Sequence, residues 1–298
     1  MRAQVCAPEA MTDSTANIPN LDCGGRPLQL DRPRIMGILN VTPDSFSDGG
    51  DWLSPRAAIL HAHHMAAAGA DIIDVGGEST RPGAAPVSIQ QELDRVIPVI
   101  EALWAEMRLP ISVDTSKPEV MRAAAGAGAG LINDVFALRN AGALDAAVDL
   151  GLPVCLMHMQ GEPRSMQAQP EYDDVVAEVE AFLLERAEAC AAAGLARSRI
   201  LLDPGFGFGK RLEHNLELLR HLPRLCAHGY PVLAGLSRKS MLGQITGRGV
   251  ERRMAGSVAL AMLAAHAGAA IVRVHDVAET RDALKVLEAV FPIATASA

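Results

Sequence analysis

Short apolar runs recur along the chain, and almost every one of them ends on a polar or charged residue. Eight runs of this kind lie between about residue 33 and about residue 276. The residues at or just after their ends are Asn40, Glu78, Asp114, Asn133, His158, Asp203, Ser237 and Arg273. Unbroken apolar runs of this length are typical of strands buried on both faces, as in parallel sheets. The pattern therefore predicts parallel strands that carry polar chemistry at their carboxyl ends.

The segments between these runs have the features of helices. Ser88 with Gln91 predicts a capping box ahead of an apolar stripe. Asp173 or Asp174 can begin a long helix, and Asp276 is expected to cap the last helix with its side chain. Strand alternates with helix from about residue 33 to about residue 290, which indicates a parallel α/β architecture.

A closed barrel and an open doubly wound sheet both fit this alternation. The open sheet usually has a glycine fingerprint after its first strand, and none follows Asn40. Eight regular units over ~250 residues favour a single (β/α)8 TIM barrel, in which the carboxyl ends of the strands meet at one mouth and form the active site. We expect this barrel domain to span residues 27–298, after a loose extension over residues 1–26 in which Met11 is an alternative start.

Composition narrows the class of protein. Hydrophobic residues make up 49% of the chain and aromatic residues only 3%, so the core is expected to consist of small and branched aliphatic side chains. The five cysteines are odd in number and lack CxxC spacing, which favours reduced thiols in a cytoplasmic protein. No apolar stretch reaches the ~20 residues that a membrane span needs. The net charge of −8 argues against nucleic acid or an anionic membrane as a partner.

Positive charge is nevertheless gathered at the predicted mouth. Arg81, Lys239, Arg273 and His275 all lie at or just beyond predicted strand ends. Cations held together in this way favour a phosphate or a diphosphate as the bound group.

Three other strand ends carry residues of a different kind, namely Asp114, Asn133 and Asp203. Carboxylates repel phosphate, but they can accept hydrogen bonds from the amine and ring N–H of a flat heterocycle. The mouth is therefore predicted to have an acidic half that binds a heterocycle and a basic half that binds an oxyanion.

Longer motifs surround these residues. They occupy residues 35–50, 71–83, 112–115, 132–134, 157–161, 203–210, 237–240 and 273–276. In sequence and in order these motifs resemble the signatures of the bacterial dihydropteroate synthase family, and the resemblance extends from about residue 28 to about residue 292. The resemblance implies a Mg²⁺-dependent TIM-barrel enzyme of folate biosynthesis. It would join p-aminobenzoate to 6-hydroxymethyl-7,8-dihydropterin diphosphate, release pyrophosphate and act as a homodimer.

The resemblance also implies roles for individual residues. The pterin-binding residues would be Asp114, Asn133, Met157, Asp203, Phe208 and Lys239. The diphosphate-binding residues would be Asn40, Thr80, Arg81, Arg273 and His275, with Asn40 also placing the Mg²⁺ ion. The aminobenzoate side would consist of Phe46, Pro82, Ser237 and Ser240. The catalytic residues would be Asp114, Asp203, Lys239 and Arg273, of which the two carboxylates would stabilise a cationic pterin methylene.

Some features have more than one interpretation. The polar segments 41–53 and 77–87 are expected to be lids that close over the diphosphate. We interpret Asp74 and Asp134 as structural hydrogen-bonding groups, whereas His158 is either catalytic or a satisfied histidine at a strand end. Two other functions remain compatible with the motifs, a pterin- or folate-binding barrel of the methyl-transferring kind and a synthase paralogue without activity.

Overall fold

The architecture is a barrel of eight parallel strands. The computed structural model describes residues 20–42, 55–79, 83, 85–161, 166 and 169–292. The barrel strands are β3 (Arg34–Asn40), β4 (Ile72–Gly76), β5 (Ile111–Asp114), β6 (Leu131–Asp134), β7 (Val154–Met157), β8 (Ile200–Asp203), β9 (Leu233–Ala234) and β10 (Ile271–Val274). They are hydrogen-bonded in the order β8-β7-β6-β5-β4-β3-β10-β9, and every pairing between them is parallel.

The barrel closes between β8 and β9 through a short contact. Strand β9 pairs with β10 over two residues, and a single parallel bridge between Leu202 and Val232 joins its start to β8. The Leu202 amide also donates a hydrogen bond to the Pro231 carbonyl at 3.0 Å. The prediction of a closed parallel (β/α)8 barrel is therefore confirmed.

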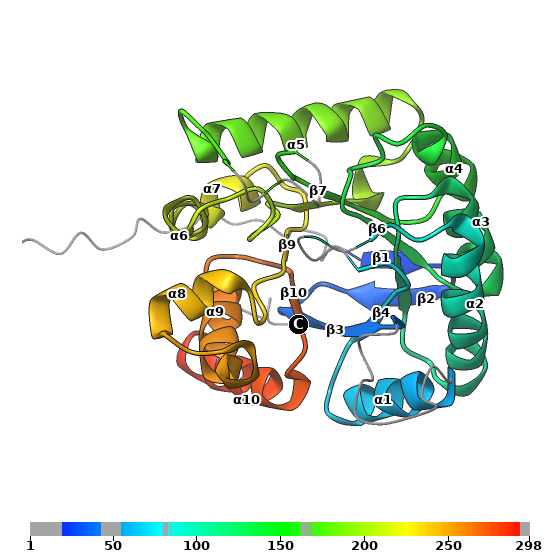
Figure 1. Cartoon of the computed structure of the whole chain (residues 1–298), viewed down its shortest axis with the longest axis horizontal. Helices are drawn as coiled ribbons and strands as arrows, with labels where there is room; N and C mark the ends of the chain where they lie inside the picture. Colours follow the sequence, from blue (N-terminus) through cyan, green and yellow to red (C-terminus); the bar gives the residue numbers. More distant parts are fainter. Residues whose placement is uncertain are drawn as a thin grey trace, which may run out of the picture.

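Helices surround the strands on the outside (Figure 1). They are α1 (Pro55–Ala67), α2 (Ile89–Glu106), α3 (Pro118–Ala127), α4 (Ala143–Leu150), α5 (Val175–Ala192), α6 (Leu212–Arg220), α7 (Leu222–Cys226), α8 (Ser240–Thr246), α9 (Met254–His266) and α10 (Val277–Val290). Short 3₁₀ helices occupy Arg197–Arg199 and Val250–Arg252. None of the helices in the described part of the chain is long and apolar enough to cross a membrane.

Two of the three helix caps expected from the sequence are confirmed. Ser88 and Gln91 form the capping box of α2, and the Asp174 carboxylate accepts hydrogen bonds from the first turn of α5. Helix α10 also begins after Asp276, but the expected side-chain cap is wrong, because the Asp276 carboxylate makes no hydrogen bond to the helix. Its carboxylate binds the Arg238 guanidinium instead, at 2.5 and 3.2 Å.

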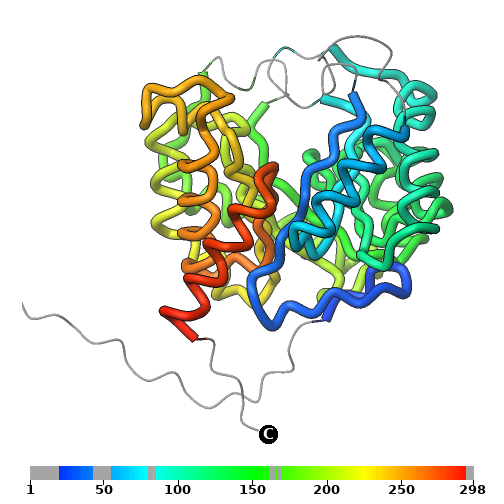
Figure 2. Tube along the Cα trace, turned by 90° about the horizontal axis from the view of Figure 1, so that it is seen from below, coloured from blue at the N-terminus to red at the C-terminus, as the bar shows by residue number. Residues whose placement is uncertain are grey.

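A hairpin closes the amino-terminal end of the barrel (Figure 2). It consists of β1 (Asn20–Cys23) and β2 (Arg26–Gln29), which pair in antiparallel fashion. Its buried side chains pack on the first interior layer of the barrel, in one cluster that contains Leu21, Cys23, Leu28, Met36, Ile72, Leu131, Cys155, Leu201, Leu233 and Ile271. The expected boundary after residue 26 falls inside this hairpin, so the expectation of a loose extension is wrong for residues 20–26. Residues 1–19 lie outside the described residues.

Candidate active site at the carboxyl ends of the strands

The structure brings the expected strand-end residues to one mouth. In the strand register Asn40 lies opposite Gly76, Gly76 opposite Asp114, and Asp114 opposite Asn133. Ser237, Lys239, Ser240 and His275 follow β9 and β10 at the same end of the barrel. Four expected site residues, Phe46, Thr80, Arg81 and Pro82, lie outside the described residues. So do residues 43–53 of the first expected lid segment and residues 80–82 and 84 of the second.

Arg273 lies between the two expected halves of the mouth and joins them. Its Nε donates to Asp74 Oδ2 at 2.6 Å, and its Nη2 donates to Asp114 Oδ2 at 2.8 Å. Asn133 Nδ2 donates to the same Asp74 oxygen at 3.1 Å. Burial lowers the pKa of Arg273, but the two carboxylates outweigh burial and hold the pKa above its usual value. Asp74 is therefore a structural hydrogen-bonding group, as expected, and it fixes two site residues at once.

The two carboxylates of the acidic half lie at the strand ends, where Asp203 is buried and Asp114 is half-buried. Burial raises the pKa of Asp114 to about 7, against the opposing effect of Arg273. Burial likewise raises the pKa of Asp203 to about 6, although the Gly205 amide and Lys239 stabilise its charged form. Asp203 Oδ1 accepts the Gly205 N–H at 2.7 Å, and no other described residue hydrogen-bonds to this carboxylate. Its second oxygen is available to a ligand.

Lys239 and Phe208 meet across the mouth from different loops. The Lys239 ammonium lies 3.9 Å from the centroid of the Phe208 ring, a cation–π contact between the loops after β8 and β9. Burial and the neighbouring Arg273 lower the pKa of Lys239 to about 8, so the side chain is mostly charged near neutral pH. Phe208 also packs against a small apolar cluster that contains Met157, which gives this side of the mouth an apolar surface.

The structure contradicts the positive charge expected for His275. Its Nδ1 lies 3.0 Å from Ser237 Oγ, and its backbone N–H donates to the same oxygen at 3.1 Å. Burial, followed by repulsion from Arg273 and Arg238, lowers the pKa of His275 to about 3. The expectation that His275 adds positive charge to the mouth is therefore wrong, and the ring acts as a neutral hydrogen-bonding group.

Lys210 is a buried lysine whose role was not predicted from the sequence, and burial lowers its pKa to about 7. Its residue surface is 3% exposed, and its ammonium lies 2.9 Å from His158 Nδ1. This contact settles the interpretation of His158, which is a satisfied buried histidine. On its outer side Lys210 lines, together with Ser240, a surface cavity of ≈ 460 Å³. The sequence feature that could have indicated a role for Lys210 is its position in a glycine-rich loop directly after a strand.

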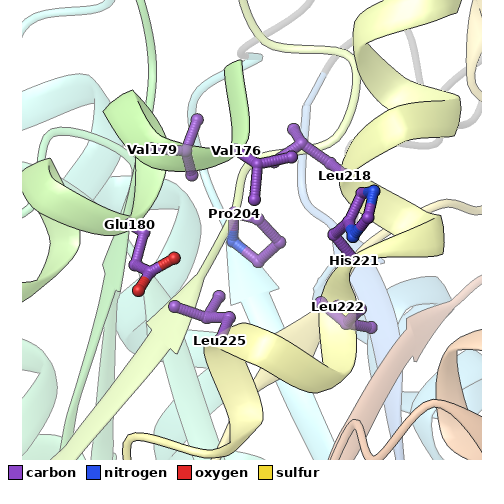
Figure 3. Close-up of a pocket in the computed structure, with 8 residues that line it drawn as sticks. All are labelled: Val176, Val179, Glu180, Pro204, Leu218, His221, Leu222 and Leu225. Carbon is purple, nitrogen blue, oxygen red and sulfur yellow. The ribbon is translucent and has the colours of Figure 1, made fainter. Parts of the chain in front are cut away.

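A second hollow lies on the outer wall of the barrel, between α5, α6 and α7 (Figure 3). It is lined by Val176, Val179, Glu180, Pro204, Leu218, His221, Leu222 and Leu225, and its volume is ≈ 10 Å³. That volume holds about one water molecule. This hollow is therefore a packing defect between helices, separate from the mouth.

Comparison with known proteins decides the family. The family model described as "Pterin binding enzyme" matches residues 36–275. The chain belongs to the pterin-binding enzyme family.

Within this family the chain is similar to bacterial dihydropteroate synthases. It is 57% identical to the Escherichia coli (strain K12) dihydropteroate synthase over 265 residues, which cover 89% of this chain and 94% of the relative. The Xanthomonas albilineans dihydropteroate synthase with 4-aminobenzoic acid is 61% identical with a TM-score of 0.89, and the match covers 93% of this chain and 99% of that one. The same enzyme in complex with 7,8-dihydropteroate is 58% identical with a TM-score of 0.85, covering 92% and 99%.

Proposed function

We propose that this protein is a dihydropteroate synthase. It condenses 6-hydroxymethyl-7,8-dihydropterin diphosphate with p-aminobenzoate, and it yields 7,8-dihydropteroate and pyrophosphate for folate biosynthesis. The observation that carries the proposal is the group formed by buried Asn133 and Asp203 and half-buried Asp114, next to Lys239 and Arg273. The chain that carries this group is more than half identical to synthases whose structures contain aminobenzoate and dihydropteroate.

The acidic half has the donors and acceptors that a pterin requires. Asp203 has one oxygen to which no described residue hydrogen-bonds, and it can accept hydrogen bonds from the pterin amine and a ring N–H. Asn133 and Lys239 can donate to ring nitrogen or oxygen, and Asp114 can accept from a further ring N–H. Met157 and Phe208 provide apolar surface for the faces of the ring.

The basic half binds the diphosphate in this proposal. Arg273 supplies fixed positive charge, and neutral His275 supplies a hydrogen bond. Arg81 and Thr80 complete this half on the strength of the family motif. Arg273 is ion-paired with Asp74 and Asp114, and these two carboxylates hold the guanidinium in a fixed position beside the proposed diphosphate site.

Mg²⁺ fits this half as an ion carried largely by the diphosphate. Among the described residues no group of three or more His, Cys, Asp or Glu side chains could hold a metal ion. Gly76 leaves a small space at the strand ends, since a Cβ atom there would lie 3.7 Å from both Asn40 Oδ1 and Asp114 Oδ2. One amide oxygen with phosphate oxygens and water is a usual Mg²⁺ environment. When bound, the ion neutralises charge on the departing diphosphate.

The remaining chemistry is electrostatic. As the bond to the diphosphate breaks, positive charge spreads from the exocyclic methylene into the pterin ring. Asp114 and Asp203 stabilise that charge from fixed positions. The neutral aminobenzoate amine then attacks the methylene carbon, so that a C–N bond replaces the broken C–O bond, and the proton that the nitrogen loses passes to solvent. No general base is needed to activate an aniline nitrogen. Phe46, Pro82, Ser237 and Ser240 form the aminobenzoate side in this proposal.

A homodimer is the assembly we propose. Large apolar side chains on α9, on α10 and directly after α10 are exposed to solvent in the single chain: Met254, Leu263, Val286, Val290 and Phe291. An apolar face of this kind is typical of a protein interface. Sedimentation equilibrium is the direct test, and a monomer at micromolar concentration would contradict this assignment.

The function is tested by product formation in a coupled pyrophosphate assay. Pyrophosphate release should require both substrates and Mg²⁺, and mass spectrometry should identify dihydropteroate. Release without aminobenzoate would indicate hydrolysis rather than synthesis. Pterin binding without any turnover would favour an inactive paralogue, and transfer of a methyl group from a folate would favour the methyl-transferring kind of barrel.

A further inference from the structure

The loop after β8 encloses the ammonium group of its own last residue, Lys210. Three acceptors lie within 3.0 Å of Lys210 Nζ: His158 Nδ1 at 2.9 Å, the Gly205 carbonyl at 3.0 Å and the Phe208 carbonyl at 3.0 Å. The His158 carbonyl lies farther away, at 3.4 Å. An ammonium group has three N–H donors, so neutral acceptors saturate it without any carboxylate.

Glycines make this enclosure possible. Gly205 and Gly209 both adopt positive φ angles, 67° and 59°. A Cβ atom on Gly205 would lie 1.9 Å from the His158 carbonyl oxygen, and one on Gly209 would lie 2.4 Å from the Gln160 carbonyl oxygen. Only glycine fits either position, because L-residues with a side chain would clash with the strand-end segment after β7. The spacing of glycines in residues 203–210 therefore matches a loop wound closely around a cation.

His158 anchors the cation to the neighbouring strand. Burial, followed by repulsion from Lys210, lowers the pKa of His158 to about 2, so the ring is neutral at working pH. Since Nδ1 accepts from Lys210, the ring proton is on Nε2. The ring packs edge-on against Phe182 at a centroid distance of 5.0 Å. Tyr172 holds the far end of the same loop, because its hydroxyl donates to the Gly209 carbonyl at 2.8 Å.

The enclosed loop carries two residues of the pterin site. At its start, the Gly205 amide fixes Oδ1 of Asp203. Near its end, Phe208 meets the Lys239 ammonium, and its carbonyl is one of the three Lys210 acceptors. Both residues therefore depend on the path of the backbone between residues 203 and 208, which Lys210 fixes at two carbonyls.

We propose that Lys210 is a positioning residue for pterin recognition, which acts through neutral His158 and the enclosed loop to hold Asp203 and Phe208 in place. This inference rests on the proposed function, because pterin affinity and kcat/KM can be measured only if the protein binds and converts the pterin substrate. Burial lowers the pKa of Lys210 to about 7, so the side chain is mostly charged below that pH. In that range Lys210 also acts electrostatically, since its charge is one of the effects that lower the pKa of Asp203. Its removal should therefore raise that pKa, which a purely structural contact would not do.

Substitutions at three positions test the proposal. Lys210→Met removes the donors and the charge at similar length, His158→Leu removes the acceptor, and His158→Asn keeps an acceptor near the position of Nδ1. Lys285→Met is the matched control, because this lysine is exposed on α10 and, among the described residues, pairs with Asp282 alone. Each variant is compared with wild type by thermal unfolding, by calorimetric binding of the pterin diphosphate substrate, and by the pH dependence of kcat/KM.

Lys210→Met and His158→Leu should each weaken pterin affinity by about tenfold or more, because a buried set of hydrogen bonds is lost. Lys210→Met should also move the acid limb of kcat/KM upward by about one pH unit, since Asp203 loses a neighbouring cation. His158→Asn should recover most of the affinity, and Lys285→Met should match wild type. Wild-type affinity with an unshifted acid limb in folded Lys210→Met would overturn the proposal, as would equal losses in both His158 variants.

Nuclear magnetic resonance of the histidine rings in the wild-type protein tests the enclosure without measuring turnover and without relying on a variant that folds. In the wild-type protein the His158 resonance, identified by its absence in His158→Asn, should report a proton on Nε2. It should also not titrate between about pH 5 and pH 8. A His158 ring that titrates near pH 6.5 would refute the enclosure, whether or not the protein forms dihydropteroate. A wild-type protein without synthase activity but with this signature would refute only the proposed function.

Discussion

Replacing Asp203 by asparagine should separate pterin recognition from folding. In the structure, Oδ1 of Asp203 accepts the Gly205 N–H at 2.7 Å. The asparagine oxygen should keep this contact, and the NH₂ group then points toward the pterin. Two hydrogen-bond donors, the asparagine NH₂ group and a pterin N–H, would therefore face each other. Loss of a buried charged hydrogen bond costs about 2–4 kcal/mol. Pterin affinity should therefore fall by between about 30-fold and several hundredfold.

The assay is calorimetric titration of the pterin diphosphate substrate, with kcat/KM measured in parallel. Asp134→Asn is the matched control, because Asp134 is equally buried but accepts from the Phe136 and Leu138 amides at 2.8 Å each. That variant should lose stability and keep its pterin affinity. Unchanged affinity in Asp203→Asn, or an equal loss in Asp134→Asn, would refute the assignment of Asp203 as a pterin ligand.

Three further outcomes are expected. The value of kcat/KM should fall as the pH drops below about 7, because Asp114 and Asp203 act as carboxylates and burial raises their pKa values to about 7 and about 6; a profile flat down to about pH 5 would contradict this. Gly130→Ala should lower the free energy of unfolding in urea by about 1–3 kcal/mol, because its Cβ would lie 2.1 Å from the Cys23 carbonyl oxygen. Gly126→Ala, which has open space around it, should gain up to about 1 kcal/mol. Sulfonamides, which copy the ring and amine of aminobenzoate, should compete with aminobenzoate; competition with the pterin substrate instead would overturn the assignment of the two halves.

The strands and their polar ends were predictable because each strand carries its own signal. An unbroken apolar run followed by Asn40, Asp114 or Asp203 indicates both burial and the end of the strand. The hairpin at the other end of the barrel was missed because its two strands have four residues each, too few to show a period. Its usable signal was the turn, since Gly24 and Gly25 both have positive φ angles, as a two-residue hairpin loop requires.

The charges at the mouth were harder to predict because they depend on contacts between distant parts of the chain. The pairing of Arg273 with Asp74 joins residues separated by 199 positions, and no local pattern reveals it. The neutrality of His275 and the enclosure of Lys210 arise from burial, which the sequence shows only as the presence of a titratable residue near a strand end.

The closure of the barrel has a consequence for its motions. The contact between β8 and β9 is a single bridge, and Asp203 and Lys239 stand on opposite sides of it. A ligand bound by both side chains would link β8 to β9 across this contact and would suppress local separation of the two strands. Thermodynamic linkage is reciprocal, so any change that destabilises the contact between β8 and β9 also lowers the affinity for the pterin.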